Sequence, residues 1–291
     1  MFYLLAPSKI CPNLPNFPRI SVKPVSGLDY NGRLFVCGGG LNTTTAFADC
    51  HTLINGVWTP TNNLKEVRRF SGVSEFPNQN GPYKYILTGG YYIDDNLSQY
   101  VLSSNEVLTA SGWKTVLPPL PVTMMAHCMV TINSTFVMAI GGRQNGINYT
   151  AKTFFLDITK CSWKEGPQLA VGRNSHRCLR IAKDEGSSEM VTMVVGGIGT
   201  TSASTEILED GASQWRQGPP LPFGLAASAD IDLPDGGALL VGGYEYRLPN
   251  LRNSFLRLRH AKTSWEELPQ KLKIGRDSHI AITVPDELVN C

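Results

Sequence analysis

The sequence contains no apolar run long enough to cross a membrane as a helix, and its excess of charge of one sign is small. The 26 basic and 24 acidic residues leave a formal net charge of +2, which gives no general attraction to nucleic acid. A membrane helix needs about 18 consecutive apolar residues, and the longest apolar stretches are much shorter. We therefore expect a soluble protein that binds neither nucleic acid nor a membrane.

Motifs of catalysis and cofactor binding are also missing. No glycine-rich loop carries a Lys-Ser/Thr step for phosphate, and the five histidines occur without His-Glu-x-x-His or Cys-x-x-Cys spacing. The stretch Asp210–Trp215 resembles the Asp box of sialidases only in part, because its Asp and Gly are adjacent. We predict no catalytic residue, no cofactor and no metal site. A metal held by His127, His176 and His279 is a minor alternative, since their common repeat position already explains their phase.

What the sequence does contain is a repeat of roughly 51 residues. Five glycine pairs each follow a short apolar run, and their second glycines are 51, 52, 55 and 46 residues apart. Each of the five tryptophans lies about twenty residues after a pair. Two residue types in one phase indicate a repeated structural unit. Its members are Gly38, Gly39, Gly89, Gly90, Gly141, Gly142, Gly196, Gly197, Gly242 and Gly243, with Trp58, Trp113, Trp163, Trp215 and Trp265.

The residues between these markers predict short strands. Apolar and polar residues alternate before each glycine pair, and β-branched and aromatic residues are frequent. No segment has the 3.6-residue apolar stripe of a helix. Four antiparallel strands in about 50 residues are typical of a β-propeller blade.

The double glycine after an apolar strand, the following tryptophan and a Leu-Pro step such as Leu120-Pro121 resemble the kelch repeat. The resemblance covers almost the whole chain. It implies a β-propeller in which only glycine permits the close backbone approach at the end of each second strand. It also implies that each tryptophan packs on the neighbouring blade.

The two ends of the chain predict one further blade. Residues 279–284 resemble a first strand, and residues 2–4 with Leu14-Pro15 fit a third and a fourth strand. We therefore predict a single all-β domain over residues 1–291, a six-bladed kelch-type β-propeller with four antiparallel strands in each blade. The alternative is a fragment of a longer kelch protein. The expected repeats cover about residues 18–66, 67–122, 123–172, 173–223 and 224–272, and the sixth blade combines residues 273–291 with 1–17.

In such a blade, the loop between the second and third strands and the link to the next blade leave the same end of the sheet. These segments are rich in Tyr and Arg, which interaction sites favour. We predict a monomeric, non-catalytic module that binds a protein or peptide, with arginines suited to acidic groups. The expected partner-binding residues are Arg69, Tyr91, Tyr92, Arg143, Tyr149, Arg173, Tyr244, Tyr246, Arg247 and Arg276.

Two alternatives to this function stay open. In the first, the link arginines hydrogen-bond turn carbonyls and serve the fold. In the second, the chain is a propeller enzyme that acts on carbohydrate, of the glycosidase or oxidase type. Converging carboxylates or a bound metal would favour the enzyme, whereas a surface lined with Tyr and Arg would favour recognition.

Cysteines and glycosylation sequons leave the cellular compartment open. Seven cysteines are an odd number and fit neither a complete disulfide framework nor a metal set. Cys37 and Cys50 lie on adjacent strands and can pair in an oxidising environment, and Cys128 and Cys178 lie on neighbouring first strands. Free buried thiols are the commoner expectation for all of these cysteines. We slightly favour the cytoplasm over secretion. Asn-x-Ser/Thr sequons occur at Asn42, Asn96, Asn133 and Asn148.

Overall fold

The computed structural model describes residues 3–6, 9–11, 15–19, 21–41, 44–76, 81–145, 149–198, 202–245 and 250–283. The chain divides into two compact units, one made of Met1–Met125 with His279–Cys291 and the other of Ala126–Ser278. The prediction of one domain over residues 1–291 stays a prediction. Within the described ranges the secondary structure consists of strands, and no helix there is long and apolar enough to cross a membrane.

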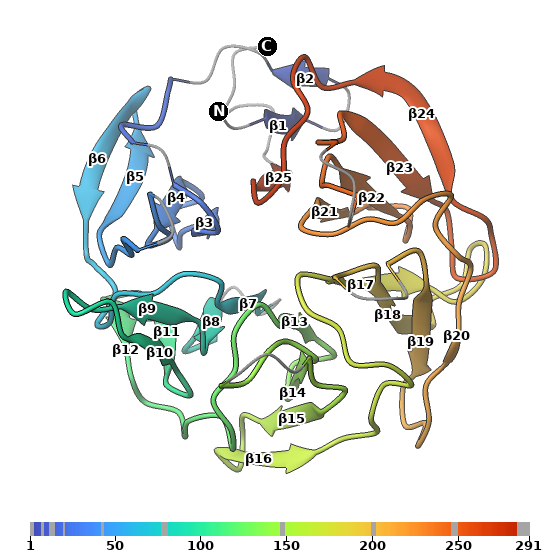
Figure 1. The fold of residues 1–291 in the computed structure, drawn as a ribbon, viewed down its shortest axis with the longest axis horizontal. Helices are drawn as coiled ribbons and strands as arrows, with labels where there is room; N and C mark the ends of the chain where they lie inside the picture. Colours follow the sequence, from blue (N-terminus) through green and yellow to red (C-terminus); the bar gives the residue numbers. More distant parts are fainter. Residues whose placement is uncertain are drawn as a thin grey trace. The chain divides into compact units, whose positions relative to one another are not determined.

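Three four-stranded antiparallel sheets form Ala126–Ser278 (Figure 1). In each sheet the strands follow one another in chain order, so every sheet is a simple meander, as predicted for a propeller blade. The strands are β13 (Cys128–Thr131), β14 (Phe136–Ile140), β15 (Thr153–Asp157) and β16 (Ser162–Glu165); β17 (Arg177–Ala182), β18 (Met190–Val195), β19 (Thr205–Glu209) and β20 (Arg216–Gln217); and β21 (Ala229–Asp232), β22 (Ala238–Val241), β23 (Ser254–Leu258) and β24 (Glu266–Lys271).

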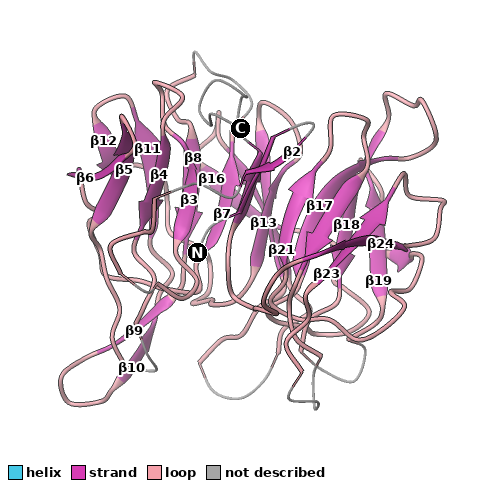
Figure 2. Cartoon of the chain, turned by 90° about the horizontal axis from the view of Figure 1, so that it is seen from above, coloured by secondary structure: helices cyan, strands magenta, loops and turns pink. Residues whose placement is uncertain are grey.

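The other unit contains two blades of the same kind. A separate two-stranded hairpin, β9 (Tyr91–Ile93) with β10 (Gln99–Val101), lies in the loop between the second and third strands of its second blade. Figure 2 shows this hairpin projecting beyond the ends of β8 and β11. The blade strands are β3 (Val25–Leu28), β4 (Leu34–Cys37), β5 (Cys50–Ile54) and β6 (Val57–Thr61), followed by β7 (Gly72–Glu75), β8 (Tyr85–Thr88), β11 (Asn105–Thr109) and β12 (Gly112–Lys114).

The prediction of six blades is wrong, because the described residues form five four-stranded blades. The ends of the chain do meet, but β1 (Tyr3–Ala6), β2 (Lys9–Cys11) and β25 (Ala281–Thr283) form a three-stranded sheet in the order β2-β1-β25. β1 pairs antiparallel with β2 and parallel with β25. In a four-stranded meander the first and third strands run in the same direction, so they pair in parallel where no second strand separates them. The expected second strand falls in residues 284–291, outside the described part of the chain.

The glycine pairs end the second strand of each blade in a left-handed backbone conformation. All ten glycines have φ between 57° and 108°. At Gly141, where φ is 62°, an added Cβ would lie 2.6 Å from His176 Cε1 and 2.9 Å from the carbonyl oxygen of Arg173, so no side chain fits. The second glycine of a pair donates its N–H to the link after the blade, as Gly142 does to Arg173 O at 2.8 Å. The pairs therefore bring the sheet end and the next link into direct backbone contact.

Tryptophans pack toward the preceding repeat. The Trp113 ring, which is buried, lies 6.1 Å from the Phe35 ring of the blade before it, centroid to centroid. Trp265 belongs to a core cluster with Leu179 and other residues of the preceding blade. The indole N–H of Trp215 donates to Pro167 O at 2.8 Å. These contacts form apolar cores between neighbouring blades.

A second repeated feature is a backbone conformation, and no single residue type marks it in the sequence. One residue in each link before a first strand has positive φ, between 51° and 56°. Within Ala126–Ser278, the N–H groups of Ser175, Ala227 and Ser278 each donate at 2.8 Å to the equivalent residue one link earlier, beginning with Ala126 O. A backbone belt thus joins the links of that unit. The six residues are Lys23, Phe70, Ala126, Ser175, Ala227 and Ser278.

Candidate functional site on the loops and links

One end of every blade is built from the loop between the second and third strands and from the adjoining links. We call these segments the loop end of a blade. Isolated β-bridges join a loop to a link at Arg69–Tyr91, Asn174–Ile198 and Ala226–Tyr244. The antiparallel meander brings both kinds of segment to the same sheet end, and the bridges hold them there.

Exposed apolar side chains concentrate at the loop end. Ten large hydrophobic residues of the described segments are exposed, and nine of them lie in these loops or links. The exception is Val57, which is 64% exposed at the start of β6 and so at the opposite end of its blade. A concentration of exposed apolar side chains on one kind of segment is typical of interaction sites. The nine are Leu41, Val67, Leu97, Tyr100, Val116, Tyr149, Val171, Leu251 and Ile274.

Glycines in the links allow the link backbone to pack directly against exposed residues of the loops. An added Cβ at Gly172 would lie 2.4 Å from the Tyr149 carbonyl oxygen, and one at Gly275 would lie 2.5 Å from that of Leu251. Because no side chain fits there, the backbone of Val171-Gly172 rests on Tyr149 and that of Ile274-Gly275 rests on Leu251. Sequence analysis did not select these glycines, although the recurring Gly-Arg step at 172–173 and 275–276 was a usable signal.

A cation and aromatic rings meet at the loop end of the second blade, around Arg69. Its guanidinium carbon lies 4.5 Å from the centroid of the Tyr91 ring and 5.9 Å from that of Phe70, and the group also donates to the Tyr91 hydroxyl. Lys23 Nζ lies 5.8 Å from the Phe70 ring centroid. Arg69 itself is buried, whereas Phe70 and Tyr91 are half-buried and reach the surface. We call Lys23, Arg69, Phe70 and Tyr91 the Arg69 patch.

The other expected partner residues are distributed along both units. Tyr92 stacks on Tyr100 in the β9–β10 hairpin, with ring centroids 5.1 Å apart. Arg143, Tyr244 and Arg276 are half-buried at the loop end of Ala126–Ser278. The remaining two expected residues, Tyr246 and Arg247, lie outside the described part of the chain.

Arg173 lies inside the fold and not on a partner surface, since it is only 2% exposed. Its Nη1 donates to Gly196 O at 3.0 Å and its Nη2 to Glu206 Oε1 at 2.7 Å. Arg68 repeats this arrangement toward Gly89 O at 2.9 Å and Glu106 at 3.1 Å. Burial lowers the pKa of both guanidinium groups, and the facing glutamate opposes that shift.

These two arginines join a link to the glycine pair and third strand of the next blade. The expected alternative, in which link arginines hydrogen-bond turn carbonyls, describes Arg68 and Arg173. The glutamates were not selected from the sequence, because a buried glutamate on a strand differs from an exposed one only through its tertiary partner.

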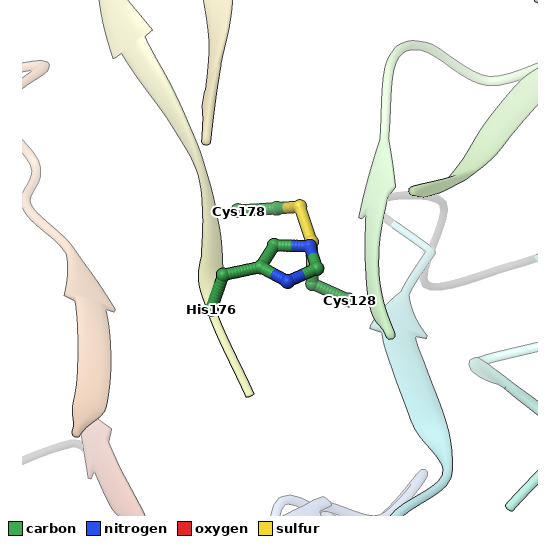
Figure 3. A group of neighbouring side chains, drawn as sticks. All are labelled: Cys128, His176 and Cys178. Atoms are coloured by element: carbon green, nitrogen blue, oxygen red, sulfur yellow. A yellow bond between two sulfur atoms is a disulfide. The ribbon is translucent and has the colours of Figure 1, made fainter. Parts of the chain in front are cut away.

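Figure 3 shows a buried group made of Cys128, His176 and Cys178. Their potential ligand atoms lie within 4.8 Å of one another. The expectation of free thiols is wrong, because Cys128 and Cys178 form a disulfide between the first strands β13 and β17. Zinc binds the thiolate form of cysteine, and the two sulfur atoms of a disulfide carry no thiolate.

His176, the third member of this group, is an uncharged imidazole. Its Nε2 lies 3.1 Å from the carbonyl oxygen of Ile140, which only accepts, so Nε2 carries the proton. Burial lowers the pKa of His176 well below its ordinary value, and the ring is therefore neutral. Together with the disulfide, this makes the group a structural link between two blades.

The pairing that the sequence left open for Cys37 and Cys50 is also present, since these residues form a disulfide across β4 and β5. Cys161 is a free and exposed thiol.

Two carboxylates on β21 have contrasting surroundings. Asp230 Oδ1 lies 3.2 Å from Arg177 Nε, within ion-pair distance. Asp232, two residues later, lies on the same face of the strand. Asp232 is exposed, yet the protein atoms around its carboxyl group and the charge of Asp230 raise its pKa to about 7.

Asp232→Asn is expected to stabilise the fold above pH 7 and to have little effect near pH 4. Since the folded pKa of about 7 exceeds the ordinary 3.8, the folded state binds this proton more tightly than the unfolded chain does. The resulting stability is present below about pH 4 and is lost as the pH rises to about 7. Asparagine cannot ionise and keeps the neutral form.

The measurement is the difference in Tm between variant and parent across this pH range. The neutral buried His127 and His176 act in the opposite sense on acidification, so only the difference isolates Asp232. A difference that does not change with pH would contradict the assignment.

Comparison with known proteins gives a structural likeness only. No protein-family model and no curated protein sequence matches the chain. A solved structure titled "Structure of YjhT" is similar to 92% of this chain and 89% of its own, with a TM-score of 0.70 and 13% sequence identity. At this identity the likeness shows the fold alone, and the chain has the all-β, bladed architecture of a β-propeller.

Proposed function

We propose that this chain is a kelch-type propeller that binds a protein or peptide segment at the loop end of its blades. The observation that carries the proposal is that, of the ten exposed large hydrophobic residues in the described part of the chain, nine lie in loops or links at the loop end of their own blades. Apolar and aromatic side chains supply most of the binding energy of protein interfaces. A surface that binds no partner gains no stability from exposing such side chains together.

The chemistry of the loop end favours a segment that is apolar and acidic. Arg143 and Arg276 accompany the exposed Tyr149, Leu251 and Ile274 in Ala126–Ser278. In the other unit the Arg69 patch presents the half-buried aromatic rings of Phe70 and Tyr91, with the buried Arg69 against them. Half-buried arginines such as Arg143 and Arg276 pair with carboxylates at an interface rim and make association depend on salt.

Ile274→Asp and Leu251→Asp are expected each to weaken binding of a selected peptide at least tenfold, with little change in Tm. Ile274 is 68% exposed, so its replacement removes partner contact but little of the core, and the new carboxylate repels an acidic ligand. The measurement is titration of the purified chain with peptides selected from a random library. The selected peptides should be rich in Asp or Glu next to apolar residues.

Val57→Asp is the matched control, because Val57 is equally exposed but lies at the opposite end of a blade. It should leave peptide affinity unchanged. If Val57→Asp weakens binding as much as Ile274→Asp does, the loop end is not the site.

A carbohydrate-active enzyme is the second candidate, and Asp230 with Asp232 favours it. Two carboxylates on one strand face, of which Asp232 has a raised pKa, are the residue types that glycoside hydrolysis uses. The test is turnover of a panel of aryl glycosides by the parent and by Asp232→Asn. Turnover by the parent that is lost in Asp232→Asn supports the enzyme. Absence of turnover by the parent supports the binding module.

A further inference from the structure

Two disulfides cross-link the described part of the chain. Cys37 and Cys50 lie directly opposite each other on β4 and β5, and Cys128 joins β13 to Cys178 on β17. All four residues are buried, so these bonds belong to the core. Structural disulfides form and persist in oxidising compartments and are rare in the cytosol. They point to the compartment in which Asn-x-Ser/Thr acceptors are glycosylated.

The first described sequon, Asn96-Leu97-Ser98, forms the tip of the β9–β10 hairpin. The Asp94 carboxylate accepts the N–H of Asn96 at 3.0 Å and that of Ser98 at 2.8 Å, and Asp94 O accepts the N–H of Leu97 at 3.0 Å. Asp94 therefore closes the turn by itself. The Asn96 carboxamide is left exposed, with no hydrogen bond to any described residue.

The second described sequon, Asn133-Ser134-Thr135, forms the turn between β13 and β14. Asn133 Oδ1 accepts the N–H groups of Thr135 and Phe136, each at 2.9 Å. With the oxygen held inside the turn, the nitrogen on the other side of the planar carboxamide faces away from it. Asn133 and Ser134 are both exposed, so this side of the turn is open to solvent.

We propose that this protein folds in an oxidising secretory compartment and carries N-linked glycans on Asn96 and Asn133. In each case an oligosaccharide moves from a lipid diphosphate donor to Nδ2. The bond from its anomeric carbon to nitrogen forms, the bond from that carbon to the diphosphate oxygen breaks, and the amide loses one proton. Ser98 and Thr135 supply the hydroxyl that the acceptor motif requires.

A glycan on Asn96 also accounts for the most exposed large apolar residue. Leu97 is 72% exposed in the middle of this sequon, and an attached sugar chain covers it. The proposed partner surface then consists of the other eight exposed residues at the loop end, without Leu97. The glycan proposal does not depend on that surface, because it rests on the disulfides and on the geometry of the two turns.

The test is secretion of the full chain from eukaryotic cells behind a supplied signal sequence, followed by mass spectrometry. Enzymatic removal of N-glycans in heavy-oxygen water converts each occupied Asn to labelled Asp. Label is expected at residues 96 and 133. The two disulfides are expected in the same non-reduced protein, with Cys161 open to alkylation.

Single variants separate the sites. Asn96→Gln and Ser98→Ala should each remove one glycan, and Asn133→Gln and Thr135→Ala should each remove one other. All four should keep the parent's affinity for the selected peptides, so loss of glycans and loss of the binding function are distinguishable. Unlabelled residues 96 and 133 in disulfide-bonded, folded protein would overturn the proposal, as would folded protein in which these disulfides are absent.

Discussion

Replacing Arg173 with methionine is expected to lower the free energy of unfolding by about 3–5 kcal/mol. The side chain is 2% exposed and holds Glu206, the Gly196 carbonyl and Ser204 of the next blade. Methionine fills much of the volume but leaves the Glu206 carboxylate buried without its cation. An uncompensated buried charge is the dominant cost, and chemical denaturation followed by tryptophan fluorescence measures it.

Two further variants test this explanation. Combining Arg173→Met with Glu206→Leu should recover a large part of the loss, because no charge then stays buried. Asp210→Ala removes the partner of Arg180 in an ion pair whose aspartate is half exposed, and it should cost no more than about 1 kcal/mol. If the double variant is as unstable as the single one, the lost stability comes from packing or from the hydrogen bonds to the backbone.

Replacing both Cys128 and Cys178 with alanine is expected to cost about 4 kcal/mol under non-reducing conditions, since the bond closes a loop of 50 residues. The same change at Cys37 and Cys50, which are 13 residues apart, should cost about 3 kcal/mol. The cross-link limits the unfolded chain more when it spans a longer segment. It also joins first strands of two blades, whereas the shorter one lies within a blade.

Denaturant titration of the two double variants provides the comparison, and Cys161→Ala is the control. Cys161 is exposed and unpaired, so its removal should leave the midpoint unchanged. A larger effect at Cys37 and Cys50 than at Cys128 and Cys178 would contradict the loop-length explanation.

Several elements could be predicted because they depend on local chemistry. A glycine pair reports a backbone with positive φ that few other residues adopt, and the alternating runs before it report strands with one buried face. That Cys37 and Cys50 lie opposite each other followed from their places on adjacent strands of one blade. Each of these features is decided within a few residues or within one meander.

The blade count and the roles of charged residues could not be obtained in this way. β1 pairs with β25 in parallel, although the repeat pattern predicted four antiparallel strands at the ends. Arg173 and Arg276 occupy the same position in the repeat, yet one is buried on Glu206 and the other is half exposed. For Arg173 the deciding factor is the Glu206 carboxylate on the next blade, which lies 33 residues away in the sequence.

The sequence by itself determined the repeated blade unit, though not the number of blades, since backbone conformation and strand periodicity are short-range properties that recur in each repeat. Only the tertiary structure decided which cations are buried, which cysteines are bonded and where exposed apolar side chains gather. These depend on distances between residues of different blades, and such distances exist only once the sheets have packed.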